Sequence, residues 1–295
     1  MSPAPRAASV LRSGRALRSW RAKGVSETVP GAPMPRWTAN IAFLFPELPF
    51  LDRIAAAKRA GFDKVECHFP YDVGIAALRE HLGAAGVRMT GLNTAAGDRS
   101  RGEFGFAGVP GQEDRFRRDF AQALDYAVAL EASVIHVMAG VVSPEDRPQA
   151  LRTYVANLRA AAREAAGTGL TLVLEPLNTR DNPGYLVSRS DDIAGIIADI
   201  GEPAVKLLFD VYHVQIMEGD LIRRLQRHRD IIGHVQVAGV PDRAEPDGDN
   251  EINYAAVLKA LDGIGYEGLV GLEYRPRGRT EDGLGWLRDA ASFAP

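Results

Sequence analysis

Short apolar runs alternate with longer amphipathic segments from Trp37 onward. Eight of these runs are rich in aliphatic and β-branched residues, which predicts eight β-strands. Their apolar character is nearly continuous instead of alternating, as is typical of parallel strands covered on both faces. The predicted strands are residues 37–44, 63–69, 87–93, 133–139, 171–175, 205–210, 231–236 and 269–273.

The segments between the predicted strands have the period of helices. Residues 116–130 and 151–165 repeat apolar side chains at three- and four-residue steps, so each predicts a helix with one face against a sheet. Glycine recurs where a helix would end, which fits left-handed C-caps; these glycines are Gly61, Gly86, Gly169, Gly201 and Gly265. Eight such units predict an α/β fold of the (β/α)8 barrel type, with a doubly wound open sheet as the alternative.

The N-terminal residues differ in composition from the rest of the chain. Residues 1–35 hold six arginine or lysine residues against one acid and are rich in Ala, Ser, Gly and Pro. We expect a disordered basic extension here: an organelle transit peptide, a flexible arm, or residues added by a start upstream of Met34. Residues 36–295 are expected to form a single barrel domain of ordinary size.

Composition and charge narrow the classes of function. The chain has 295 residues, 46% of them hydrophobic, and a formal net charge of −3, while residues 36–295 alone carry −8. This negative charge disfavours nucleic-acid binding. No apolar run has the length of a membrane span, and the single cysteine, Cys67, has no partner for an internal disulfide. We expect a cytoplasmic protein, compatible with a homo-oligomer, that binds neither membrane nor nucleic acid.

Common nucleotide-binding and hydrolase motifs are missing from the sequence. A G-x-G-x-x-G string at residues 263–268 precedes a predicted strand, whereas a dinucleotide site needs the strand first. We interpret the string as a turn. No P-loop, G-x-S-x-G or H-E-x-x-H motif occurs. We therefore expect no nucleotide or organic cofactor.

Four polar residues close the last four predicted strands. Glu175, Asp210, Gln236 and Glu273 lie 35, 26 and 37 positions apart, and each gap fits one loop, one helix and the next strand. In a parallel barrel the carboxyl ends of the strands converge on one face. Oxygen ligands suit Mg²⁺ or Mn²⁺ better than zinc. The pattern predicts one divalent ion bound by these four side chains.

Each of these residues also has a structural interpretation. Pro176 keeps Glu175 extended, but Glu175 alone is equally explained as a surface acid or a helix cap. Asp210 at the start of a helix is typical of an N-cap. His213, three residues further on, either contacts the substrate or has a structural role. It is their combination on consecutive strands that favours the metal site.

Further polar side chains occupy the ends of the earlier predicted strands. They are Glu66, His68, Asn93 and His136. We expect them to complete the rim of the same cavity and to bind the substrate together with His213. His136 also fits a packed position inside the barrel. An ion chelated by a carbonyl and a neighbouring hydroxyl acidifies the C–H bond between them. Two carboxylates can then transfer the protons of an aldose–ketose isomerisation.

Several long segments resemble the hydroxypyruvate isomerase and 2-oxo-tetronate isomerase family of xylose isomerase-like TIM barrels. They are residues 45–72, 175–185, 209–220, 232–254 and 268–276. The resemblance implies isomerisation of a small hydroxy-oxo acid, in the type reaction hydroxypyruvate to 2-hydroxy-3-oxopropanoate. It also implies that Glu175 and Glu273 transfer the protons and bind the metal with Asp210 and Gln236.

The chain departs from the family pattern in three loops. Ala-Gly-Val-Pro at residues 238–241 replaces Ala-Asp-Asn-Pro, the stretch before residues 251–254 is one residue longer, Thr94-Ala95 replaces Leu-Pro, and Arg275 replaces lysine. Arg275 either pairs with a substrate carboxylate or forms a solvent-facing salt bridge. The alternatives to hydroxypyruvate isomerisation are 2-oxo-tetronate isomerisation, ketose 3-epimerisation, metal-dependent cleavage at abasic sites in DNA, and ion binding without catalysis.

Overall fold

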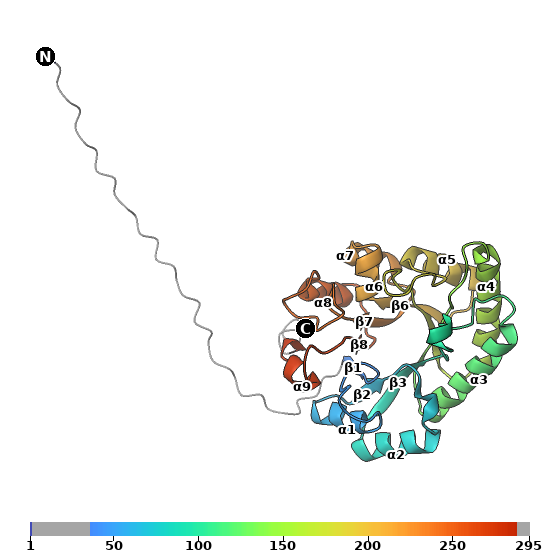
Figure 1. The fold of residues 1–295 in the computed structure, drawn as a ribbon, viewed down its shortest axis with the longest axis horizontal. Helices are drawn as coiled ribbons and strands as arrows, with labels where there is room; N and C mark the ends of the chain where they lie inside the picture. Colours follow the sequence, from blue (N-terminus) through green and yellow to red (C-terminus); the bar gives the residue numbers. More distant parts are fainter. Residues whose placement is uncertain (2–35, 288–295) are drawn as a thin grey trace.

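The structure, a computed structural model, describes Met1 and residues 36–287 (Figure 1). The basic extension expected over residues 1–35 falls, apart from Met1, outside the described residues. Over the part that is described, no helix is long and apolar enough to cross a membrane. The elements of one barrel follow one another from Trp37 to Gly283.

Eight parallel strands close into a barrel in the order of the sequence. Every strand pairs in parallel with the next, and β1 pairs with β8, so the (β/α)8 prediction is confirmed and the open sheet is excluded. The strands are β1 (Trp37–Asn40), β2 (Lys64–Glu66), β3 (Arg88–Asn93), β4 (Val134–His136), β5 (Thr171–Leu174), β6 (Val205–Asp210), β7 (Ile232–Val237) and β8 (Val270–Leu272).

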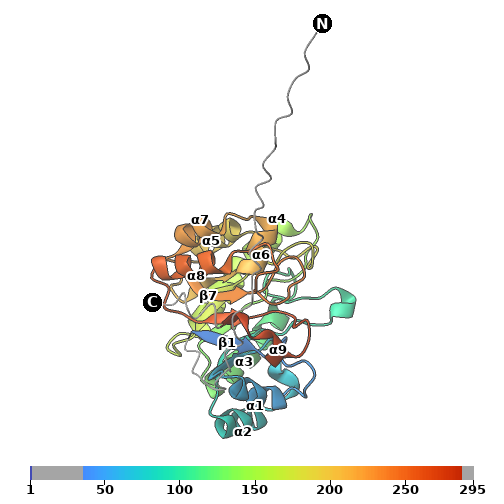
Figure 2. The same ribbon diagram turned by 90° about the vertical axis from the view of Figure 1, so that its left-hand side faces the viewer.

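Helices surround the barrel on its outside (Figures 1 and 2). They are α1 (Asp52–Arg59), α2 (Ile75–Ala85), α3 (Glu113–Ala129), α4 (Arg147–Glu164), α5 (Ser190–Ile200), α6 (Val211–Met217), α7 (Leu221–His228), α8 (Tyr254–Gly263) and α9 (Thr280–Gly283), with 3-10 turns at η1 (Pro70–Asp72) and η2 (Arg99–Arg101). The two helices predicted from their apolar periods are α3 and α4. Phe116 and Phe120 of α3 and Tyr154 and Leu158 of α4 are buried, as the periods require.

The glycines predicted to end helices all have positive φ angles. Gly86 and Gly201 directly follow α2 and α5 in the left-handed conformation, with φ of 62° and 70°. A side chain would strain these positions, and glycine therefore lets the chain turn from helix to strand.

The strand register brings the predicted metal ligands to one end of the barrel. Asp210 on β6 pairs with Gln236 on β7. Glu175 and Glu273 follow immediately after β5 and β8. Side chains that lie far apart in the sequence therefore meet at the carboxyl-terminal face, where barrels of this type carry their active sites.

Candidate metal centre and cavity

A cavity of about 250 Å³ opens at the carboxyl-terminal end of the barrel. Seven of the ten residues predicted for the site line it: His68, Asn93, His136, Glu175, His213, Glu273 and Arg275. The other three, Glu66, Asp210 and Gln236, are 3%, 0% and 6% exposed and lie among buried partners next to it. Nine of the ten residues are linked around the cavity by contacts with one another or with shared neighbours. Arg275 lies at the rim of the cavity and joins them through its backbone.

The two carboxylate oxygens of Asp210 have different surroundings. It is the N-cap of α6, because Oδ1 accepts a hydrogen bond of 2.8 Å from the backbone N–H of Tyr212. Oδ2 is buried and has no hydrogen-bond partner. The cap therefore fixes the carboxylate and leaves one oxygen directed at the centre of the site.

Gln236 is oriented in a similar way. Its Nε2 donates to Glu66 Oε1 over 2.8 Å, while its Oε1 is buried without a partner. Glu175 also leaves Oε1 without a partner; its Oε2 lies 3.4 Å from His136 Nδ1. Buried polar atoms normally have hydrogen-bond partners, and these oxygens without one are therefore available to a cation or a hydrogen-bond donor.

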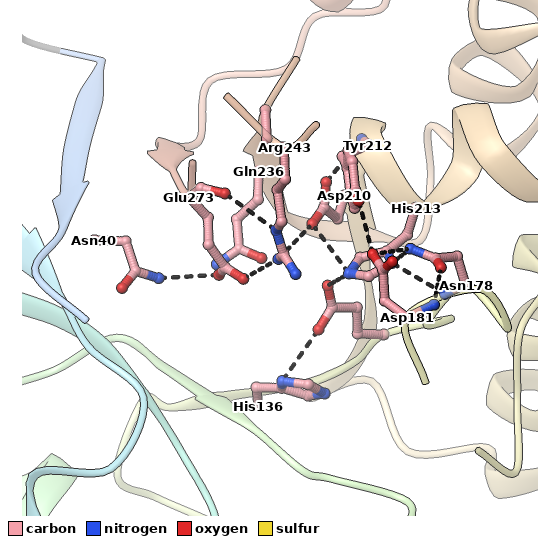
Figure 3. Close-up of polar contacts among 12 residues, drawn as sticks. Asn40, His136, Asn178, Asp181, Asp210, Tyr212, His213, Gln236, Arg243 and Glu273 are labelled. Carbon is pink, nitrogen blue, oxygen red and sulfur yellow. Dashed lines mark hydrogen bonds and ion pairs between the residues drawn. The ribbon is translucent and has the colours of Figure 1, made fainter. Parts of the chain in front are cut away.

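Glu273 differs, because both of its oxygens have partners. Oε2 accepts from Asn40 Nδ2 over 2.9 Å and lies 3.2 Å from His68 Nε2, and Oε1 pairs with the guanidinium of Arg243. Figure 3 shows Arg243 between Glu273 and Asp210, whose Oδ2 is 3.6 Å from Arg243 Nη2. A cation of the protein itself therefore lies among the predicted metal ligands.

Arg243 was not predicted from the sequence. It lies in the loop after β7, where Gly239 and Ala244 pair as an antiparallel bridge and residues 240–243 form the turn between them. A Cβ at position 239 would lie 2.6 Å from the carbonyl oxygen of Glu245, so this turn of the loop requires glycine there. A basic residue in the loop that follows a ligand-bearing strand was the sequence feature that could have identified Arg243.

The tautomer of His213 follows from its hydrogen bonds. The backbone N–H of Asn178 donates to Nδ1 over 3.0 Å, and burial lowers the pKa of the ring well below its usual value. The neutral ring therefore carries its proton on Nε2, which lies 3.7 Å from Glu175 Oε1 and 3.6 Å from Asp210 Oδ2. His213 can donate this proton to an oxygen in the cavity.

The charges of the three acids differ strongly. Burial raises the pKa of Asp210 to about 7, and burial together with the charges of Glu273 and Asp210 raises the pKa of Glu175 well above its usual value. Burial would also raise the pKa of Glu273, but His68 and Arg243 outweigh it and lower that pKa to about 2. The positive charge of Arg243 therefore does not offset the effect of burial on the pKa values of Glu175 and Asp210.

The arrangement fits a divalent ion. Glu175, Asp210 and His213 each place one ligand-type atom within 4.8 Å of the others. The unpaired Oε1 of Gln236 adds a neutral oxygen. Because His213 carries its proton on Nε2, the available donors are oxygens, the ligand type that Mg²⁺ and Mn²⁺ prefer.

The remaining predicted residues lie at the wall and rim of the cavity. Burial lowers the pKa of His136 to about 3, so the ring beside Glu175 is neutral. The carbonyl of Asn93 accepts from the hydroxyl of Tyr71. Arg275 forms no ion pair with any residue of the described ranges, and its backbone N–H donates to the carbonyl of Arg243 over 2.7 Å. Its guanidinium is therefore available to an anion.

Comparison with known proteins identifies the family. Residues 54–290 match the family described as xylose isomerase-like TIM barrel. A 2-oxo-tetronate isomerase from Cupriavidus necator is 46% identical over 256 residues, which cover 86% of this chain and 98% of the relative. The hydroxypyruvate isomerase of Escherichia coli is 38% identical over 255 residues, which cover 86% and 98%.

A solved structure has the same fold. The crystal structure of an AP endonuclease, family 2, from Brucella melitensis superposes with a TM-score of 0.84 at 41% identity, covering 87% of this chain and 99% of that one. The two chains therefore share the barrel fold over most of their lengths.

The raised pKa values predict that cation binding releases protons. At pH 6 the metal-free protein holds a proton on Asp210, whose pKa is about 7, and the raised pKa of Glu175 favours the protonated form of that residue as well. A cation must displace the proton of Asp210, so we expect its affinity to rise with pH by about tenfold per unit up to about pH 7. Calorimetric titration with Mn²⁺ in buffers of different ionisation enthalpy measures the protons released. An affinity independent of pH between 5 and 7 would contradict this charge distribution.

Proposed function

The chain belongs to the xylose isomerase-like TIM barrel family, and we propose that it is a divalent-metal-dependent aldose–ketose isomerase for a small hydroxy-oxo acid. Its relatives at 38% and 46% identity are isomerases, and the chain is accordingly an isomerase. The substrate, the metal and the mechanism are the parts that we propose here.

The single observation that supports the proposal best is the set of unpaired oxygens at the end of the barrel. Glu175, Asp210 and Gln236 each leave one buried oxygen without a partner, next to Glu273. We propose that these four side chains hold one Mg²⁺ or Mn²⁺ ion. When bound, such an ion acts as a Lewis acid that polarises a carbonyl and stabilises an enediolate.

We assign the proton transfers of the proposed reaction to Glu175 and Glu273. In the proposed reaction one of them removes a proton from C3 of hydroxypyruvate, and the electrons of that bond form the enediolate. The other returns a proton to C2, while the proton of the C3 hydroxyl passes to the oxygen on C2. The product is 2-hydroxy-3-oxopropanoate, an isomer of the substrate. His213, whose Nε2–H faces the site, donates a hydrogen bond to a substrate oxygen.

The charges at the cavity favour an anionic substrate. Arg243 is partly buried, with 11% of its side chain exposed, and Arg275 lies at the rim with no ion pair to any described residue. Guanidinium groups bind carboxylates in a bidentate manner. Hydroxypyruvate is the leading substrate, and 2-oxo-tetronates are the second candidate because the Cupriavidus isomerase of that name is 46% identical.

Isotope exchange tests the proposed function directly. Protein with Mn²⁺ or Mg²⁺ is incubated in deuterated water with hydroxypyruvate, 2-oxo-tetronates, a free ketohexose and DNA that contains an abasic site. We expect the acids to interconvert with their isomers and to exchange carbon-bound hydrogen, as seen by NMR, because an enediolate loses that proton. Faster turnover of the ketohexose would favour an epimerase, and cleavage of the DNA would favour the activity named for the Brucella protein. No exchange with any acid would refute the proposal.

Substitution of either glutamate tests the proton transfers. We expect Glu175→Gln and Glu273→Gln each to lower kcat by at least ~10²-fold, because an amide cannot accept or return the proton. Glu164→Gln is the matched control, since Glu164 is an exposed residue at the end of α4. Steady-state rates with hydroxypyruvate measure the effect. Near-normal turnover in either variant would remove that glutamate from the mechanism.

Arginine substitutions locate the partner of the substrate carboxylate. We expect Arg243→Gln to raise KM for hydroxypyruvate by at least ~10-fold, the effect of losing a charge-assisted hydrogen bond, and to leave KM for a neutral ketose nearly unchanged. Arg275→Gln, at the exposed rim, serves as the comparison. If KM rose only in Arg275→Gln, the carboxylate would bind at the rim, and the role given to Arg243 would be wrong.

A further inference from the structure

Glu66 makes a contact across the inside of the barrel. It is the last residue of β2, and it accepts a hydrogen bond from Gln236 on β7 although β1 and β8 lie between those two strands. Both oxygens of Glu66 are engaged, and the side chain is 3% exposed. Glu66 does not line the cavity, so its effect on a bound ion or substrate has to pass through its neighbours.

A glycine on β8 makes this contact possible. Gly271 pairs with Gln236 in the strand register. A Cβ at position 271 would lie 2.4 Å from Glu66 Oε1 and 2.9 Å from Gln236 Cγ. Any other residue would displace one of the two side chains. The barrel interior is therefore shaped to bring the Glu66 carboxylate against the Gln236 amide.

The partners of Glu66 determine which way the amide of Gln236 points. Oε1 of Glu66 receives Gln236 Nε2 at 2.8 Å and Asn40 Nδ2 at 3.2 Å, and Oε2 lies 2.9 Å from His234 Nε2. An amide nitrogen only donates and a carboxylate oxygen accepts. A reversed amide would place two oxygens against each other. Gln236 Oε1 is therefore held away from Glu66, and it is buried without a hydrogen-bond partner.

We propose that Glu66 is a positioning residue that fixes the amide of Gln236 with its oxygen presented to the cation. The inference rests on the proposed function, because it concerns the same cation. Asn40 extends the effect to a second ligand: its Nδ2 donates to Glu66 Oε1 and also to Glu273 Oε2, the latter over 2.9 Å. Partners of this kind orient ligands before the ion arrives.

The test is the affinity of the protein for Mn²⁺, measured by titration calorimetry or by electron paramagnetic resonance in the absence of substrate. We expect Glu66→Gln to weaken binding by about 10- to 100-fold, the usual effect of losing an outer partner of a metal ligand. The glutamine side chain of this variant has one acceptor oxygen, whereas three side-chain nitrogens, from Gln236, Asn40 and His234, point at this position. Its own amide attracts the oxygen of Gln236 away from the cation.

A double-mutant cycle separates positioning from charge or general stability. If Glu66 acts through Gln236, the weakening caused by Glu66→Gln is reduced to less than ~5-fold when Gln236 is already alanine. An equal fold-change in both backgrounds would mean that Glu66 acts through its charge or through barrel stability, and would overturn the proposal. If the unmodified protein bound no Mn²⁺, the proposed metal-dependent function would fall and the inference with it.

Two further variants control for disturbance of the barrel interior. Gly271→Ala leaves every polar group unchanged but displaces Glu66 or Gln236 and so separates the two, and we expect it to weaken Mn²⁺ binding in the same range. Thr90→Val removes buried hydrogen bonds of Thr90 to Thr38 and to the carbonyl of Val65, away from the ligands, and should change affinity by less than ~3-fold. A loss of affinity in Thr90→Val as large as in Glu66→Gln would overturn the proposal.

Discussion

Three carboxylates buried at one end of the barrel are the interaction on which the rest of the site depends. Glu175, Asp210 and Glu273 are 6%, 0% and 4% exposed. Negative charges removed from water need a cation or a proton. Arg243 supplies one positive charge and shares it between Glu273 and Asp210. Glu175 and Asp210 respond with raised pKa values, so the protein without a metal balances its charges by holding protons.

The fold and the meeting of four strand-end polar residues were predictable from the sequence for the same physical reason. Strands covered on both faces appear as continuous apolar runs, and all eight were found. Most are shorter than predicted, as β1 ends at Asn40 instead of residue 44, whereas β7 ends one residue later than predicted. A polar residue at the end of such a run stands out against its neighbours. Glu175, Asp210, Gln236 and Glu273 could therefore be recognised, because the barrel converts four separate strand ends into one face.

Contacts that depend on side-chain reach or loop shape could not be predicted. Arg243 enters the site because the loop after β7 turns back at Gly239, which no periodic pattern records. The proton position on His213 depends on a backbone N–H of Asn178, 35 residues earlier. Glu66 was expected at the rim with the substrate, and the structure places it beneath, against Gln236. Such features follow from the three-dimensional packing alone.

The structure also shows that a structural and a functional interpretation of one residue are compatible. Asp210 caps α6 with Oδ1 and leaves Oδ2 without a hydrogen-bond partner, and Gln236 is held by Nε2 and leaves Oε1 without one. Each side chain uses one atom for orientation and the other for the site, so little ordering remains to be done when a ligand binds.

Glu273 differs from the other three predicted ligands, because it links the guanidinium of Arg243 to the proposed divalent ion. Arg243 occupies the oxygen that Glu273 would offer to a metal. In the proposed function a divalent ion would compete with the guanidinium for the same carboxylates and would weaken their hold on Arg243. The charge of Arg243, which lies beside the cavity, would then be available to the carboxylate of an anionic substrate.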